Sequence, residues 1–442
     1  MMHANKGVLN KTLNTPLARR FIHGAKWSVL GSALSSALTL LMSILVARNL
    51  GIEEFGKFIV LQSTLAMVGI MAGFGIGSVA TRYVAELKGR NKPRISHILG
   101  LSELFVLGFG FLVSTSLALS ASYMATHILN SPSLTVPLGI SACAVFFIGL
   151  DSYQRSVLIG FEAMRTLAIG ATTSAALGLP IMLIASAKYH LFGASIAIVI
   201  ISIIQALVSR YQVNGELKKS NLFRKLEGSL KELPVLWKFA IPSLLSSLLV
   251  APSHWTVQAF LANTPNGYSE LAILGIAMQW FNIIVYIPNM AGRVVLPILT
   301  NQVADKDRHG TRKILVYATS INAVVSIPIA IIICICSSYI MDMYGKSYTS
   351  HNVPLVISAL TATLLAILLP ISNLLAATSR MWIGVIINVV WGLFYIILSY
   401  FLIDKGATGI MISMLTAYAF NLILTIWYLK YFDEISSRSL HG

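Results

Sequence analysis

The strongest constraint on this chain is a repeated pattern of long apolar stretches that carry almost no charge. A stretch of about 20 such residues crosses the roughly 30 Å hydrocarbon core of a bilayer as an α-helix. The composition agrees, because 56% of the 442 residues are hydrophobic, 11% are charged and the mean hydropathy is +0.78. Soluble domains carry about 25% charged residues. The sequence therefore predicts an all-α polytopic membrane protein.

The apolar stretches predict about twelve membrane helices in two lobes of six. The predicted spans are residues 24–46, 58–80, 96–119, 136–159, 167–187, 193–213, 237–262, 271–296, 314–341, 353–377, 381–403 and 407–428. The long hydrophilic segment Tyr211–Lys238 is basic and amphipathic, and it is expected to form a cytoplasmic linker helix. The predicted parts are an N-terminal arm (1–23), a first lobe (24–213), the linker (214–236), a second lobe (237–430) and a tail (431–442).

The two lobes begin with similar sequences. A shift of 215 residues places Ser28 on Ser243 and Ala47 on Ala262. The lobes therefore read as parallel repeats related by an axis along the membrane normal, an arrangement that transporters use to alternate access.

The basic residues set the predicted orientation. With both termini in the cytoplasm, 27 of the 32 Lys and Arg residues fall on the inner side. Those on the outer side are Arg48, Lys57, Lys188, Lys346 and Lys405. This bias predicts cytoplasmic termini, so the net charge of +16 reflects topology and not nucleic-acid binding.

Cysteine placement bears on metal and disulfide chemistry. Cys143, Cys334 and Cys336 all fall inside predicted spans, and positions i and i+2 of a helix do not share a face. We therefore expect no disulfide framework, no metal site and no cofactor.

Two acidic residues lie within predicted spans of the first lobe, Glu103 and Asp151. A charged side chain at the centre of a membrane helix costs about 2.5 to 3.5 kcal/mol, so it normally faces a partner or a cavity. Arg155 is four residues after Asp151 and can neutralise it. The sequence leaves two interpretations open: a structural ion pair, or a polar cavity in which Arg155 is available to a phosphate. Glu103 and Asp151 are also the candidates for coupling to H⁺ or Na⁺.

Polar residues in the second lobe form a single helical stripe. Their spacing of 3, 4, 3 and 4 places them on one face, and they are Gln279, Asn282, Tyr286, Asn289 and Arg293. Amides facing lipid would be unsatisfied, so the stripe either lines a water-filled cavity or forms hydrogen bonds between helices. Amides and a phenol suit sugar hydroxyls, and the planar fork of Arg293 suits a phosphate. His254, two residues after a helix-kinking proline at Pro252, is a further candidate for either a structural or a functional role.

Several segments carry a family resemblance. They are ARNLGIEEFGKF (47–58), RYVAE (82–86), YSELAILGIAMQW (268–280) and VVLPILTNQ (294–302). The chain resembles, over essentially its whole length, the polysaccharide transporter family of the multidrug/oligosaccharidyl-lipid/polysaccharide flippase superfamily. Within that family it is most similar to the O-antigen and exopolysaccharide repeat-unit flippases.

The resemblance implies a MATE-like fold with a central cationic cavity. It implies a non-enzymatic flippase in the bacterial inner membrane that moves a polyprenyl-pyrophosphate-linked oligosaccharide, an O-antigen, capsule or exopolysaccharide repeat unit, to the outer leaflet. Arg48 matches the family's Leu-Ala-Arg motif, here Val46-Ala47-Arg48. On this interpretation Arg48, Arg155 and Arg293 attract the pyrophosphate, and the amides of the stripe meet the sugars. The expected partners are the lipid-linked oligosaccharide, membrane lipids, and polysaccharide polymerase and chain-length proteins.

Other functions stay open. Glu103 and Asp151 permit a multidrug antiporter of the same superfamily, although the arginines of the candidate cavity disfavour cationic drugs. His254 and Trp255 stand where relatives often have an acidic residue, so ion coupling does not carry over from them. A flippase for the peptidoglycan lipid precursor fits the same residues. The short outer loops disfavour a membrane-embedded glycan polymerase or ligase.

Overall fold

The computed structural model describes residues 16–73, 75–88, 91–225, 232–234, 250–305, 307–378 and 381–438. At some helical positions, Arg293 among them, only the backbone is described. Within these ranges all regular structure is helical, which confirms the all-α prediction.

The chain divides into two compact units. Unit 1 comprises Met1–Asn49, Thr64–Thr126 and Ser131–Leu248, and unit 2 comprises Leu50–Ser63, His127–Asn130 and Leu249–Gly442. The bounds of the predicted lobes stay predictions.

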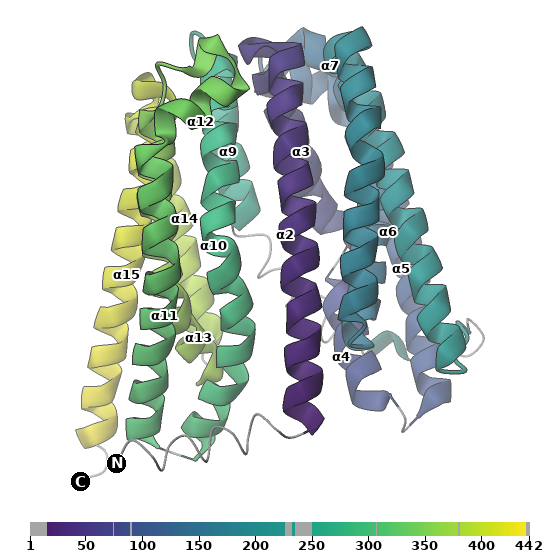
Figure 1. Ribbon diagram of the computed structural model, residues 1–442, viewed down its shortest axis with the longest axis vertical. Helices are drawn as coiled ribbons and strands as arrows, with labels where there is room; N and C mark the ends of the chain where they lie inside the picture. Colours follow the sequence, from purple (N-terminus) through teal and green to yellow (C-terminus); the bar gives the residue numbers. More distant parts are fainter. Residues whose placement is uncertain are drawn as a thin grey trace. The chain divides into compact units, whose positions relative to one another are not determined.

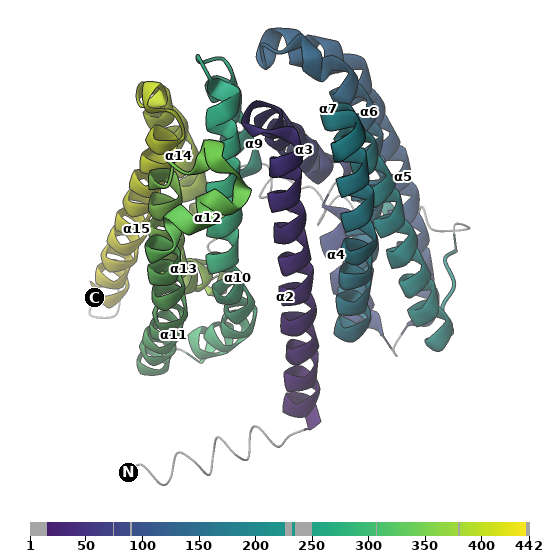
Figure 2. The same ribbon diagram turned by 45° about the horizontal axis from the view of Figure 1, so that its top comes forward.

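Unit 1 is built mainly from long helices (Figure 1). They are α2 (Pro16–Leu50), the second part of α3 (Ile52–Gly73), α4 (Ile76–Leu87), α5 (Lys92–Tyr123), α6 (Thr135–Gly160) and α7 (Met164–Lys219), with the short helix η2 (Pro132–Leu134) and the first part of η1 (Met124–Ile128). Helix α6 packs against α4, α5 and α7. Figure 2 shows α5, α6 and α7 side by side from a second direction.

Unit 2 is also helical, and three of its described helices are short. Its elements are α9 (Val250–Ala262), α10 (Gly267–Ala304), α11 (Arg308–Ile335), α12 (Ser337–Tyr344), η4 (Lys346–Tyr348), α13 (Val353–Ala377), α14 (Met381–Phe401), η5 (Ile403–Lys405) and α15 (Gly406–Arg438). Helix α13 packs against α10, α11 and α15, so it forms the centre of the unit.

Ten described helical segments are long and apolar enough to cross a membrane. Helix α7 is one of the ten and contains two of the predicted spans, 167–187 and 193–213. The backbone dihedral angles leave the helical region between these spans, at Tyr189 and His190 (φ 49° at His190). Helix α9 is the described part of the predicted span 237–262. The prediction of a multi-pass membrane protein is confirmed, and the cytoplasmic termini stay a prediction.

The surfaces of these helices suit lipid. Phe111 and Leu119 of α5 are 67% and 82% exposed, as expected where the solvent is hydrocarbon. Aromatic residues that favour the membrane–water interface are exposed near helix ends, among them Tyr123, Tyr339 and Tyr400.

The predicted span 58–80 is not one helix. Helix α3 ends at Gly73 and α4 begins at Ile76, with Gly75 between them at φ 64°. This left-handed conformation costs glycine nothing but strains other residues, so the glycines of the segment allow the chain to break here. The prediction of a single continuous span is wrong at this position.

Small residues bring α4 and α6 together. A side chain at Gly160 of α6 would lie 2.9 Å from the carbonyl oxygen of Thr81. Thr81 Oγ1 donates to the carbonyl oxygen of Ser156 at 2.8 Å. This close packing is typical of membrane helices, and it fixes the part of α6 that carries Asp151 and Arg155.

The predicted linker helix 211–238 is helical in its described part only over 211–219 and 232–234, and 211–219 is the end of α7 and not a separate helix. Helix α7 continues to Lys219, and the chain then turns through Asn221 (φ 52°) into a non-helical segment, Leu222–Lys225. This segment lies on α5, where the backbone N–H of Lys225 donates to the carbonyl oxygen of Ser96 at 3.1 Å. A side chain at Gly100 would collide with the Lys225 carbonyl oxygen, so a glycine is needed for the two chains to meet.

Gly56 gives a test of packing in unit 2. A Cβ at this position would collide with the carbonyl oxygen of Tyr268, a backbone atom that cannot move aside. Gly56→Ala should therefore destabilise the protein by about 1–3 kcal/mol through overpacking. The measurement is the apparent melting temperature in detergent.

The matched control is Gly108→Ala, because nothing lies within 4 Å of a Cβ at Gly108 and a helical alanine there should be neutral or stabilising. Equal melting temperatures for the two variants would contradict this account of Gly56.

Candidate functional site

Both predicted intramembrane acids of unit 1 are buried. Glu103 on α5 and Asp151 on α6 are each 8% exposed. A buried carboxylate is stable in its ionised form only with a cation or hydrogen-bond donors close by, and the structure supplies both to each of them.

Asp151 is held by two neighbours. Arg155 Nε lies 2.7 Å from Asp151 Oδ2, one turn along the same helix. Ser209 Oγ of α7 donates to Asp151 Oδ1 at 2.6 Å. The predicted pairing of Asp151 with Arg155 is confirmed, and Ser209 ties the pair to a second helix.

Arg155 also faces a cavity of about 170 Å³ within unit 1. Hydroxyl and amide groups line this cavity from α2 and α7. The lining residues from these helices that carry such groups are Ser35, Thr39, Ser174 and Gln205. Of the two interpretations of Arg155, an ion pair or a cavity residue, the structure thus supports both at once.

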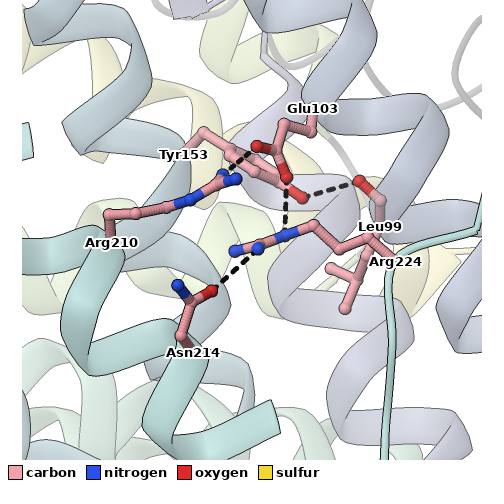
Figure 3. A network of polar contacts seen from close by, with 6 residues as sticks. All are labelled: Leu99, Glu103, Tyr153, Arg210, Asn214 and Arg224. Atoms are coloured by element: carbon pink, nitrogen blue, oxygen red, sulfur yellow. Dashed lines mark hydrogen bonds and ion pairs between the residues drawn. The ribbon is translucent and has the colours of Figure 1, made fainter.

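Glu103 bridges two arginines (Figure 3). Its Oε1 pairs with Arg210 Nη1 of α7, and its Oε2 lies 2.6 Å from Arg224 Nε, in the non-helical segment after α7. Arg224 Nη1 in turn donates to Asn214 Oδ1 at 2.8 Å. One carboxylate therefore joins α5, α7 and the segment that leaves α7.

Burial and the neighbouring charges shift the pKa of Arg224. Burial lowers the pKa of Arg224 below its ordinary value, because removing water penalises the charged guanidinium. The Glu103 carboxylate raises the same pKa and Arg210 lowers it. Close by, the Tyr153 hydroxyl donates to the carbonyl oxygen of Leu99 at 2.9 Å and so links α6 to α5.

The residues of the polar stripe on α10 lie in different environments. Gln279 Oε1 accepts a hydrogen bond from the Tyr344 hydroxyl at 3.2 Å, so this residue bonds between helices. Asn282 and Asn289 are exposed. The Tyr286 hydroxyl is buried and has no hydrogen-bond partner within the described part of the chain. Cavity lining by this stripe stays a prediction.

The remaining predicted site residues lie apart from these groups. His254 of α9 packs edge-on against Trp391 and Tyr395 of α14, with ring centroids 5.7 and 5.3 Å away, inside an aromatic cluster of unit 2. Arg48 is exposed in the last turn of α2. The side chain of Arg293 lies outside the described residues.

Sequence reasoning missed Arg210 and Arg224 as the partners of Glu103. Arg210 could have been found, because it lies inside the predicted span 193–213, where a charged residue needs a partner. Nothing in the sequence pattern places Arg224 there, since this position depends on the chain turning back onto α5.

Comparisons with known proteins place the chain in a family. The family described as "Polysaccharide biosynthesis protein" matches residues 21–303, which is more than half of the chain. The chain belongs to this family. A second family, MatE, matches residues 242–401. The predicted resemblance to the polysaccharide transporter family is confirmed.

One relative of this family member is named "EPS I polysaccharide export inner membrane protein EpsE", from Ralstonia solanacearum. It is 24% identical over 426 residues, which cover 93% of this chain and 94% of the relative.

Two solved structures share the fold. An inward-facing multidrug resistance MATE family transporter of the MOP superfamily has a TM-score of 0.72 at 12% identity and covers 92% of this chain and 99% of its own. The lipid II flippase MurJ, in an inward closed conformation, has a TM-score of 0.72 at 17% identity and covers 91% and 87%. The predicted MATE-like fold is confirmed.

The pairing of Asp151 with Arg155 can be measured by a double-mutant cycle. Asp151→Asn should lower the apparent melting temperature in detergent, because it leaves the partly buried Arg155 without its counter-charge. The Asp151→Asn/Arg155→Gln double variant should recover part of this loss, with a coupling energy of about 0.5–3 kcal/mol. Strictly additive effects of the two substitutions would show that the pair does not interact.

Proposed function

We propose that this protein is a flippase of the bacterial inner membrane that moves a polyprenyl-pyrophosphate-linked oligosaccharide from the cytoplasmic to the outer leaflet. The observation that carries the proposal is Arg155 in a cavity lined by hydroxyl, amide and apolar side chains, among membrane helices of a polysaccharide biosynthesis family member. A phosphate needs a cation, and sugars need hydrogen-bond partners, if they are to leave water. The cavity of unit 1 offers hydrogen-bond partners and the guanidinium of Arg155, which a phosphate would share with Asp151.

The proposed class of polymer is based on the name of a relative of this chain. The Ralstonia protein is named for export of an EPS polysaccharide and for the inner membrane, and it matches this chain over nearly its whole length. We therefore favour an exopolysaccharide repeat unit over an O-antigen or capsule unit. Polymerase and chain-length proteins stay expected partners.

The proposal assigns different tasks to different parts of the substrate. In unit 1, Arg155 binds the pyrophosphate, and Arg48 assists it. In unit 2, Arg293 has the same task, and Gln279, Asn282, Tyr286 and Asn289 meet sugar hydroxyls. The prenyl tail stays in lipid, because exposing it to water would cost about 0.8 kcal/mol for each CH₂ group.

Ion coupling at Glu103 or Asp151 stays a proposal, and it requires that the ion compete with an arginine for the carboxylate. Each carboxylate already pairs with arginine. A coupling H⁺ or Na⁺ therefore has to displace a guanidinium from its carboxylate, which would change the contacts between α5, α6 and α7.

Arg155 provides the test in cells. In a strain that lacks the native gene, Arg155→Gln should reduce surface polysaccharide about tenfold or more compared with the wild-type protein, the loss expected for a charge-assisted contact. Intact lipid-linked repeat units should accumulate at the same time. Arg155→Lys should retain part of the export, because it keeps the charge but loses the planar fork.

The matched control is Arg312→Gln, which removes an exposed positive charge from α11. It should export as the wild type does, and membrane levels of all variants are measured by immunoblot. Wild-type export by Arg155→Gln at equal protein level would refute the assignment of Arg155.

The alternatives predict other phenotypes in the deletion strain. An unchanged polymer together with increased drug susceptibility would favour the multidrug antiporter. Accumulation of the peptidoglycan lipid precursor would favour a flippase for that lipid. Both outcomes would contradict the proposed substrate.

A further inference from the structure

The cluster around Glu103 carries an excess of positive charge that the proposed transport function does not use. One carboxylate faces two guanidinium groups, those of Arg210 and Arg224 (Figure 3). The other buried acid of unit 1, Asp151, is matched by a single arginine. The Glu103 cluster therefore retains one unit of positive charge.

This charge is held where water is scarce. The Arg224 side chain is 18% exposed, and burial lowers its pKa. A cation in such surroundings gains more from an added anion than it would in water, because the effective dielectric constant is lower.

Arg224 still has a donor to offer. Its Nη2 is buried and lacks a hydrogen-bond partner among the residues that the structure describes. Its Nε and Nη1 are occupied by Glu103 and Asn214, so the guanidinium plane is already fixed. Arg210 is 39% exposed, which leaves a route to the cluster from outside. A fixed planar fork with an unused N–H is suited to the oxygens of a phosphate.

The backbone holds Arg224 in place independently of its side chain. The Lys225 N–H donates to the Ser96 carbonyl oxygen, and Gly100 leaves room for this segment on α5. A ligand would therefore not have to order the segment first, and this lowers the cost of binding.

The surroundings indicate where the phosphate comes from. Leu207 and Tyr211, on either side of Arg210 in the sequence of α7, are 63% and 81% exposed. The helix ends in exposed Lys218 and Lys219. Apolar, then aromatic, then basic residues along a helix are typical of the membrane–water interface, where lipid headgroups lie.

We propose that Arg210 and Arg224 bind the phosphate group of an anionic phospholipid, and that Glu103 is a built-in anion that competes with it. The site does not depend on the transport substrate. The proposal therefore predicts that removal of the Glu103 carboxylate strengthens binding of the anionic phospholipid.

The test measures lipid retained by purified, delipidated, full-length protein. Native mass spectrometry follows titration with phosphatidylglycerol, with phosphatidylcholine as the zwitterionic comparison. The wild type should prefer phosphatidylglycerol, and Arg224→Gln should lose about tenfold or more of that affinity. Arg224→Lys should fall between the two.

Glu103→Gln keeps the proposal falsifiable even if Arg224→Gln misfolds. It should bind phosphatidylglycerol more tightly than the wild type, a gain that a purely structural ion pair does not produce. Arg312→Gln is the matched control, since it removes an exposed positive charge from α11, outside the residues of the proposed lipid site, and it should bind as the wild type does.

Three outcomes would overturn the proposal. They are unchanged phosphatidylglycerol affinity in Arg224→Gln, no gain in Glu103→Gln, or an equal loss in Arg312→Gln. A separate arm titrates inorganic phosphate and follows the melting temperature. If inorganic phosphate binds more tightly than phosphatidylglycerol, the phosphate group that the two arginines bind does not come from a lipid.

Discussion

An ionised carboxylate inside a membrane helix has to be neutralised, and the architecture of unit 1 follows from how this is done. Asp151 takes Arg155 from its own helix and Ser209 from α7, while Glu103 takes Arg210 from α7 and Arg224 from the segment beyond it. Each acid thereby ties α7 to a neighbouring helix. Small residues at the α4–α6 contact hold α6, the helix that carries Asp151, close against α4.

The same constraint connects structure with function. A charge that is costly in lipid becomes useful where a polar cargo has to pass, and Arg155 combines both situations because it pairs with Asp151 and faces a cavity. This chain belongs to the polysaccharide biosynthesis family, has a MATE-like fold and divides into two compact units of helices. The proposed cargo, an oligosaccharide on a lipid pyrophosphate, matches the chemistry of the cavity in unit 1.

The sequence predicted what depends on local pattern. Hydropathy located the membrane helices, and the i to i+4 spacing predicted the contact of Asp151 with Arg155. Contacts that depend on chain reversal were not predictable, because no periodicity indicates that Leu222–Lys225 lies on α5 and brings Arg224 to Glu103. Likewise, hydropathy gave 58–80 as one span and did not predict that the chain would break between Gly73 and Ile76.

The central claim is that this chain itself moves a lipid-linked oligosaccharide across a bilayer. The most direct measurement reconstitutes the purified protein into liposomes that hold a polyprenyl-pyrophosphate-linked oligosaccharide in both leaflets, and follows the fraction that an added glycosidase can reach. With the wild-type protein this fraction should rise from about half towards completion, and with Arg155→Gln it should rise much more slowly. A fraction that stays at the level of protein-free liposomes, with correctly folded protein present, would contradict the account.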